Sequence, residues 1–206
     1  MLQRLFSLCL LFIVSTSCSL SNDGCEPFDD KFKTVDFYTD LNTITFSEGP
    51  EFYINYSSLE SETVRYEEFG ISMFPVMETY SSFSASKFSF SIIPTAYACS
   101  LLPPDSEETI TGIQIFSNQT ISSSYGTDKN LAPLFDVVVL YHSSGYERMD
   151  LGDFLASEPY VPSELFLILK SEPESDKPVR FTISYTQDGL EMSEYEITTQ
   201  PVTFVK

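Results

Sequence analysis

The sequence predicts an all-β fold: an antiparallel β-sandwich, immunoglobulin-like in type, with one short helix. Short runs rich in Val, Ile, Phe, Tyr and Thr recur from Thr34 onward, and clusters of Pro, Gly, Asn and Asp separate them. Helical periodicity is scarce. Many short strands with proline-containing turns and one minor helix are typical of a sandwich, and a β-barrel is the alternative arrangement.

Seven segments have the clearest strand pattern, because β-branched and aromatic residues dominate each of them. They are TVDFY (34–38), TITF (43–46), FGISMFPVMETY (69–80), TGIQIFS (111–117), FDVVVLY (135–141), LFLILK (165–170) and VRFTISY (179–185). Pro75 interrupts the third segment and indicates a bulge or an edge strand, because proline has no N–H to donate to a neighbouring strand.

A hairpin is expected around Asp188-Gly189, because this pair supplies the positive φ angles that a tight turn needs. Apolar and polar residues alternate before it, so one face of that strand belongs to the core. A last strand is expected near 202–204. The residues predicted to be buried are Phe181, Ile183, Tyr185, Ile113, Ile115, Val138 and Leu167.

One segment, MDLGDFLAS (149–157), has helical spacing. Leu151, Phe154 and Leu155 stand at positions i, i+3 and i+4, and Asp150 can cap the helix start. The runs VVVLY and LFLIL are apolar on both faces, so they need cover beyond the facing sheet. We expect the helix to provide that cover at one end of the sheets.

The N-terminus predicts a lipoprotein signal peptide over residues 1–17. Arg4 precedes an apolar run from Leu5 to Val14, which is shorter than the roughly 20 residues that a bilayer span needs. The small residues 15–17 directly before Cys18 resemble a lipobox, although Ser15 stands where the commonest pattern has Leu. We therefore expect lipidation of Cys18 as the first residue of the mature chain. Cleavage as an ordinary secreted protein is the alternative.

Three regions follow from this: the signal peptide 1–17, a tether at 18–31 that is rich in turn-forming and acidic residues, and a β-sandwich domain at 32–206. With Cys9 removed and Cys18 lipidated, two cysteines remain in an oxidising compartment. The sequence therefore predicts a Cys25–Cys99 disulfide. A free Cys99 with an unpaired Cys25, or pairing with another protein, is the alternative.

The composition excludes some partners. The net charge is −19, and the signal peptide contributes one basic residue and no acid, so the rest of the chain carries −20. Such a surface repels nucleic acid and anionic lipid headgroups. No metal or cofactor is predicted, because the one histidine, His142, has no second imidazole beside it, and the loops SLSNDGCEPFDD and YGTDKN lack the spacing of a calcium loop. SASK (84–87) matches SxxK without its usual partner motifs, so no catalytic residue is predicted.

The stretch IPTAYACSLLPPDSEETITGIQIFSN (93–118), behind a lipoprotein-like leader, resembles a family of uncharacterised Bacteroidota envelope lipoproteins. The motif AYAC, followed by prolines and a strand with alternating Ile, is its most specific part. The resemblance implies an envelope lipoprotein with a β-sandwich body and no assigned activity. Position 19, directly after the lipidated cysteine, is Ser and not the Asp that retains lipoproteins at the inner membrane of enteric bacteria. This favours the outer membrane. The side of that membrane that the protein faces stays open.

The leading functional hypothesis is a membrane-tethered, non-catalytic binding or scaffolding module, attached through its N-terminal lipid, with an envelope protein or a glycan as partner. The oligomeric state is left open. One alternative is a glycan or peptide hydrolase, which requires a cleft with convergent acids or His142 beside a serine. The other is a fimbrial or adhesin-type subunit, which requires an unpaired sheet edge that accepts a donor strand.

Overall fold

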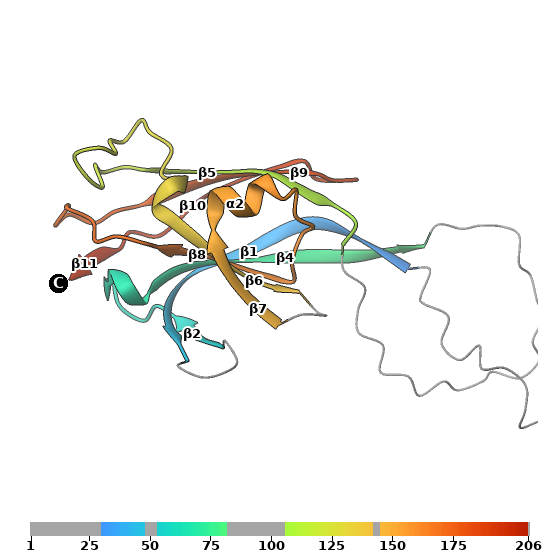
Figure 1. Cartoon of the computed structure of the whole chain (residues 1–206), viewed down its shortest axis with the longest axis horizontal. Coiled ribbons are helices and arrows are strands. Elements are labelled where there is room, and N and C mark those ends of the chain that lie inside the picture. The colour runs from blue at the N-terminus through green and yellow to red at the C-terminus, as the bar shows by residue number, and fades with distance from the viewer. Residues whose placement is uncertain (1–29, 48–52, 82–105, 142–144, 206) are drawn as a thin grey trace, which may run out of the picture.

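The structure is a computed structural model that describes residues 30–47, 53–81, 106–141 and 145–205. These residues form two facing antiparallel sheets, with a short two-stranded parallel sheet at the end where the C-terminus lies (Figure 1). The predicted all-β sandwich with one short helix is confirmed. The immunoglobulin-like connectivity stays a prediction.

Six strands form the larger sheet, in the order β2-β1-β4-β8-β6-β7, and every neighbouring pair is antiparallel. The strands are β1 (Asp30–Phe46), β2 (Ile54–Ser58), β4 (Phe69–Ser81), β6 (Phe135–Tyr141), β7 (Gly145–Asp150) and β8 (Glu164–Leu169). The smaller sheet has the order β10-β9-β5 and consists of β5 (Thr109–Ser117), β9 (Phe181–Asp188) and β10 (Glu194–Thr198). The parallel pair is β3 (Thr63–Arg65) with β11 (Thr203–Val205).

The predicted segments correspond to strands of the structure, with one merger and one wrong turn, but β2, β3 and β7 were not predicted, and β7 includes the first two residues of the predicted helix. The segments 34–38 and 43–46 belong to a single long strand, β1. The hairpin between β9 and β10 exists, but its connection is five residues long, since it spans 189–193, and Gly189 does not have a positive φ. A Cβ at Gly189 would lie 2.2 Å from the Met192 carbonyl oxygen. Close approach of the backbone, rather than a tight two-residue turn, explains this glycine.

Pro75 lies on an inner strand of the sheet at a local edge. It pairs with Phe37 of β1, whereas β8 pairs with β4 only from Gly70 to Met73. Among the described residues, no strand pairs with β4 on the β8 side of Pro75, so the missing N–H leaves no ladder hydrogen bond unmade there.

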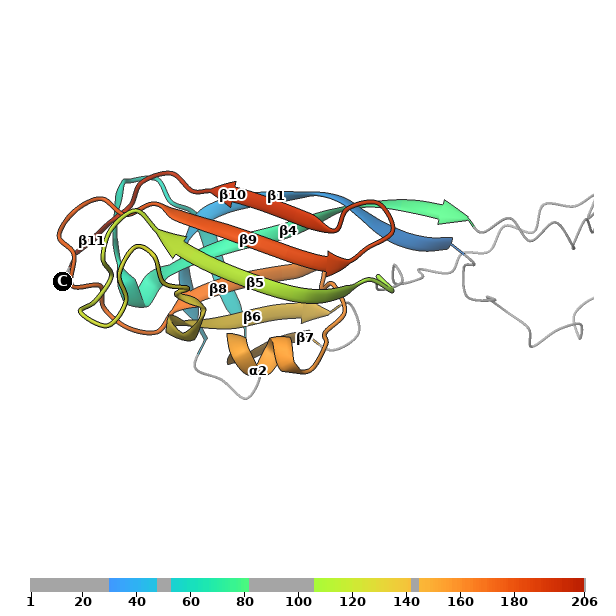
Figure 2. The same cartoon turned by 90° about the horizontal axis from the view of Figure 1, so that it is seen from above.

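The predicted helix is α2 (Leu151–Ala156). The Asp150 carboxylate caps it by accepting from the backbone N–H groups of Gly152 and Asp153, at 2.7 and 3.3 Å. A hydrogen bond from Lys170, and then the one from Gly152, lower the pKa of Asp150. Figure 2 shows α2 beside β6 and β7, where Leu151 and Phe154 are buried in the core.

The inter-sheet core is built on aromatic contacts between the two sheets. Phe181 of β9 meets Phe69 of β4 at 5.7 Å and Phe135 of β6 at 5.8 Å between ring centroids. Phe37 of β1 packs on Tyr185 of β9 at 4.5 Å. Rings at these separations bury large apolar areas, so they fix the distance between the sheets. All seven residues predicted to be buried are buried.

A second apolar cluster lies on the opposite face of the six-stranded sheet, which we call the outer face. This outer cluster consists of Ile44, Ile54, Val138, Phe166 and Ile168. The last part of β1 and β2 fold over it as a hairpin, which is visible below the sheet in Figure 1. The predicted extra cover for the two-faced apolar runs therefore exists, but the β1–β2 hairpin provides it on this face. On the outer face, the expectation that the helix covers these apolar runs is therefore wrong.

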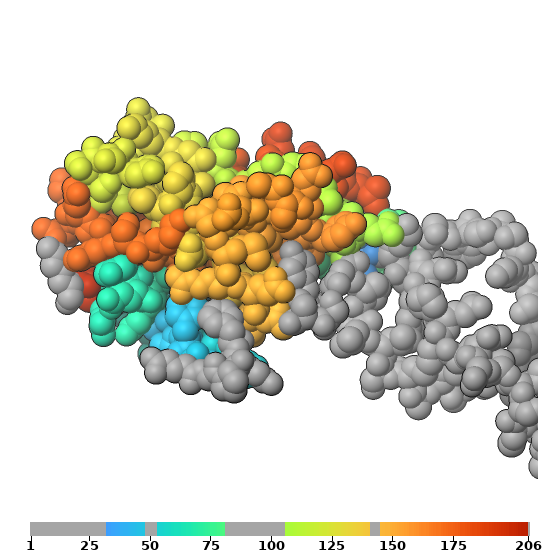
Figure 3. All heavy atoms as spheres, in the orientation of Figure 1, coloured from blue at the N-terminus to red at the C-terminus, as the bar shows by residue number. Residues whose placement is uncertain are grey.

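The sheet curls so far that the β1–β2 hairpin at one edge approaches β7 at the other. The Arg148 guanidinium of β7 lies 4.8 Å from the ring centroid of Phe46, which is in the part of β1 that pairs with β2. In the space-filling view the hairpin (blue) lies next to β7 (gold) (Figure 3). Gly70 leaves room for Ile44 of this hairpin, because a Cβ there would lie 2.1 Å from Ile44 Cδ1.

The buried carboxylate of Glu108, 3% exposed, joins segments from both sheets. Oε2 accepts from the Thr34 N–H of β1 at 2.7 Å, and Oε1 accepts from the Leu190 N–H of the β9–β10 connection at 3.0 Å. Ser106 and Gln187 donate to Oε2 at 3.3 and 3.4 Å. Hydrogen bonds to a charged acceptor are among the stronger ones in proteins, so Glu108 fastens the β9–β10 connection to the start of β1.

We expect Gly70→Ala to destabilise the domain by about 1–3 kcal/mol, because the added methyl group overlaps Ile44. Ile44→Val removes the overlapping Cδ1 atom, so Gly70→Ala should cost less in that background. Urea unfolding of the four variants of this double-mutant cycle, followed by circular dichroism, measures the coupling. Strictly additive changes in unfolding free energy would contradict the proposed contact.

We expect Glu108→Ala to lower the unfolding free energy by about 3 kcal/mol, because the buried Thr34 N–H loses its acceptor. Glu172→Ala, at an exposed carboxylate, is the matched control and should change stability by no more than about 0.5 kcal/mol. Equal stability of the two variants in urea unfolding would show that the hydrogen bonds accepted by Glu108 do not stabilise the domain.

Candidate functional site

The residues that the sequence predicts for lipidation and disulfide formation, Cys18, Cys25 and Cys99, lie outside the described residues. His142 and the SASK segment (84–87) lie outside them as well.

The loop YGTDKN (125–130) is described, and its polar groups serve the fold. Asn130 Oδ1 accepts from the backbone N–H groups of Ile115 and Ala132, both at 3.0 Å, and so holds the loop against the edge of β5. Lys129 Nζ donates to the Ser124 carbonyl. Within the described ranges, no group of three or more His, Cys, Asp or Glu side chains is placed to hold a metal ion.

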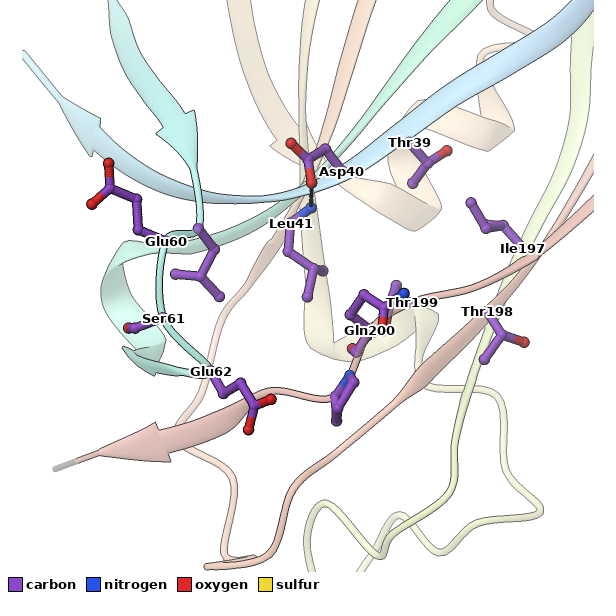
Figure 4. A pocket seen from close by; sticks show the side chains of 12 residues that line it. Thr39, Asp40, Leu41, Glu60, Ser61, Glu62, Ile197, Thr198, Thr199 and Gln200 are labelled. Carbon is purple, nitrogen blue, oxygen red and sulfur yellow. Dashed lines mark hydrogen bonds between the residues drawn. The ribbon is translucent and has the colours of Figure 1, made fainter.

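A pocket of about 390 Å³ opens at the C-terminal end, between β1, the β2–β3 loop and the segment after β10 (Figure 4). Three carboxylates line it, from Asp40, Glu60 and Glu62, and no lysine or arginine is among its lining residues. Asp40 is already engaged, because Oδ1 accepts from the Leu41 N–H at 2.9 Å and Oδ2 from the Ser58 hydroxyl at 2.5 Å. Its carboxylate therefore shapes the local backbone.

An aromatic patch occupies the outer face where the β1–β2 hairpin meets β4. The Tyr38 ring stacks on Phe74 with an interplanar angle of 11° and centroids 6.3 Å apart, and the Tyr56 ring centroid lies 5.9 Å from that of Phe74. Phe166 lies beneath, 4.8 Å from Tyr56. Tyr38 is 59% exposed and Tyr56 40% exposed. Three rings from β1, β4 and β2 thus meet at the surface; we call Tyr38, Phe74 and Tyr56 the aromatic patch.

The Glu164 carboxylate, at the start of β8, adjoins the aromatic patch. The Tyr146 hydroxyl donates to Glu164 Oε2 at 2.8 Å. Burial first, and then this hydrogen bond and the charge of Glu164, raise the pKa of Tyr146. Burial, followed by the charge of the same carboxylate, raises the pKa of Tyr56, so the Glu164 charge acts on both tyrosines.

Elsewhere on the outer face, a guanidinium is already bound by a ring and a carboxylate. Arg148 lies over the Phe46 ring, and its Nε and Nη2 donate to Asp136 Oδ2 at 3.0 and 2.8 Å. This pair shows which chemistry the outer face supports: a planar cation held by an aromatic ring and a carboxylate.

The free edge of β1 has several of its backbone groups capped by side chains. The Asp36 carboxylate accepts from the Phe37 N–H at 2.8 Å, Asp40 does the same for Leu41, and the Tyr195 hydroxyl donates to the Phe37 carbonyl at 2.7 Å. Side chains that occupy edge groups hinder the addition of a foreign strand. The donor-strand edge that a fimbrial subunit needs is therefore obstructed along this part of β1.

Sequence reasoning missed the aromatic patch because its rings come from three strands that are distant in sequence. Part of the signal is present in the segment 69–80, where Phe74 and Val76 lie on the face opposite to Ile71 and Met73. Apolar residues on both faces of that strand indicate that its second face meets something. Which ring they meet depends on the strand register.

No helix within the described residues is long and apolar enough to cross a bilayer. No family model, curated protein or solved structure matches the chain. The resemblance to the Bacteroidota lipoproteins therefore stays a prediction from the quoted motifs.

Proposed function

We propose that this chain is a membrane-tethered lipoprotein of the bacterial envelope, and that its β-sandwich is a non-catalytic binding or scaffolding module. The lipobox-like STSC sequence and the apolar run before it support the anchor. The observation that carries the proposal is that the N-terminal and C-terminal strands of the domain lie at opposite ends. Strand β1 begins at one end of the long axis, and the C-terminal strand β11 lies at the other (Figures 1 and 2). The 390 Å³ pocket is lined by the β2–β3 loop and by the segment that leads into β11.

This arrangement of the two ends suits a tethered module. A lipid on Cys18 would hold the end where β1 begins, so the sides of the sandwich and the C-terminal end would face an envelope protein or glycan. The net charge of −19 opposes adsorption to anionic headgroups, so retention at the membrane depends on the lipid. We place the anchor in the outer membrane, on the basis of Ser19.

We expect Cys18→Ser to release the protein from the membrane fraction or to stall its processing, because the thiol that accepts the lipid is gone. Fractionation with immunoblotting and intact-mass analysis of the mature N-terminus measures this. Cys9→Ser, inside the leader, is the control and should leave processing unchanged. A Cys18→Ser protein that stays with membranes as an identically cleaved chain would contradict lipidation.

The proposed Cys25–Cys99 disulfide has support from the described residues that follow each cysteine. Cys25 stands nine residues before Thr34, and Cys99 stands nine residues before Glu108. The Thr34 N–H and the Glu108 carboxylate are hydrogen-bonded at 2.7 Å. Nine residues reach at most about 30 Å, so both segments start from one place and a bridge between them is within reach.

We expect the unfolded, unreduced mature protein to show no titratable thiol, and the reduced protein to show two. Closing a loop of about 75 residues should stabilise the domain by up to roughly 4 kcal/mol, which Cys25→Ser and Cys99→Ser should each remove. Two thiols that react before reduction would refute the bridge. Mass spectrometry of a partner joined to either cysteine would reassign it to an intermolecular bond.

A further inference from the structure

The aromatic patch has the composition of a site for a planar cation. Tyr38 and Phe74 form a stacked pair in which Tyr38 is 59% exposed, and the Tyr56 ring also contacts Phe74, at 5.9 Å between centroids. Val76, next on the same face of β4, is 44% exposed. An exposed set of rings on one sheet face provides π surface for a ligand to stack on.

The charges around the patch are complementary to a cation. Glu164 adjoins it, and among the residues that the structure describes no lysine or arginine forms an ion pair with this carboxylate. Its Oε2 accepts from Tyr146, which leaves Oε1 as a further acceptor. Asp36 and Asp40 stand on the same face of β1, on either side of Tyr38. The chain as a whole has 30 acidic and 11 basic residues, so its field attracts cations.

The same face already binds one guanidinium by this chemistry. Arg148 lies 4.8 Å from the Phe46 ring centroid and donates two hydrogen bonds to Asp136. The aromatic patch and Glu164 repeat that combination of ring and carboxylate, but at a place where no described residue supplies the cation.

We propose that the aromatic patch together with Glu164 binds arginine side chains of a partner polypeptide. A guanidinium stacks on the Tyr38 or Tyr56 ring and donates to Glu164 Oε1, while the apolar stem of the arginine lies against Val76 and Phe74. Arginine fits better than lysine, because its planar group can stack on a ring and bond a carboxylate at once. This deepens the proposed function by naming the partner's chemistry, and it does not depend on the lipid anchor.

The test is isothermal titration calorimetry of the full chain in detergent, with a tetra-arginine peptide blocked at both ends as the probe. Tetra-lysine of the same charge and a neutral β-glucan oligosaccharide are the comparison ligands. We expect tetra-arginine to bind most tightly, with an affinity that falls as salt rises. If the oligosaccharide binds and tetra-arginine does not, the patch is a sugar surface and the proposal is overturned.

Two variants locate the binding. Tyr38→Ala should weaken tetra-arginine binding about fivefold to tenfold. Tyr160→Ala should leave it unchanged, because Tyr160 is also exposed, at 56%, but pairs with Thr109 at the start of β5 in the smaller sheet. Glu164→Gln keeps the side-chain shape and should weaken binding by a similar factor; Glu147→Gln, at an exposed acid of β7, is its control. Circular dichroism verifies that each variant is folded.

Binding that is insensitive to both Tyr38→Ala and Glu164→Gln would overturn the proposal, because it would reflect attraction to the net negative charge alone. Equal affinity for tetra-lysine and tetra-arginine, with no Tyr38 dependence, would do the same. Because the full chain is used whether or not it is lipidated, a failure here is separate from a failure of the tether, which membrane fractionation of Cys18→Ser reports.

Discussion

The structure depends on one constraint: β6 and β8, in the middle of the larger sheet, are apolar on both faces and must be covered on both. The small sheet covers one face, where Val137, Val139 and Leu167 are fully buried. On the outer face Val138 and Phe166 are equally buried, under the β1–β2 hairpin. Burying a side chain of this size contributes about 1.5–3 kcal/mol, so leaving the outer face open would remove a large part of the stability of a domain.

That constraint explains features that are otherwise unrelated. β1 has to be long, because its first part belongs to the sandwich and its last part turns over the outer face. Gly70 has to lack a side chain, because Ile44 occupies the space. The hairpin covers only part of the face, and the rings beside it stay at the surface. The aromatic patch is thus the exposed continuation of the outer cluster, joined to it through the contact between Tyr56 and Phe166.

Local patterns predicted the elements well, and tertiary contacts account for what they missed. The alternation in 179–185, the two-faced run in 135–141 and the Asp150 cap each depend on residues next to one another in sequence, and the structure confirms them. Glu108 is different: in the acidic segment SEET it has the pattern of a solvated residue, yet its partners come from β1 and the β9–β10 connection. Gly189 has a packing reason that its dipeptide pattern does not reveal.

The candidate site was less predictable than the fold for the same reason. Tyr38, Phe74 and Tyr56 come together only through the pairing of β1 with β4 and β2, and Glu164 joins them through β8. A single sequence shows each as one apolar or acidic residue in a strand. The predictions that concern Cys18, Cys25 and Cys99 are of another kind, because they depend on local motifs and on the chemistry of the compartment.

Hydroxyl-radical footprinting of the full chain, with and without tetra-arginine and analysed by mass spectrometry, tests the covered outer cluster and the aromatic patch together. We expect rapid labelling of Tyr38 and Tyr56, slow labelling of Phe166, and protection of Tyr38 and Tyr56 by the peptide while labelling of Tyr160 is unchanged. Labelling of Phe166 at the rate of Tyr38 would contradict the covered outer cluster. Equal protection of Tyr38 and Tyr160, or of neither, would contradict the aromatic patch as the binding surface.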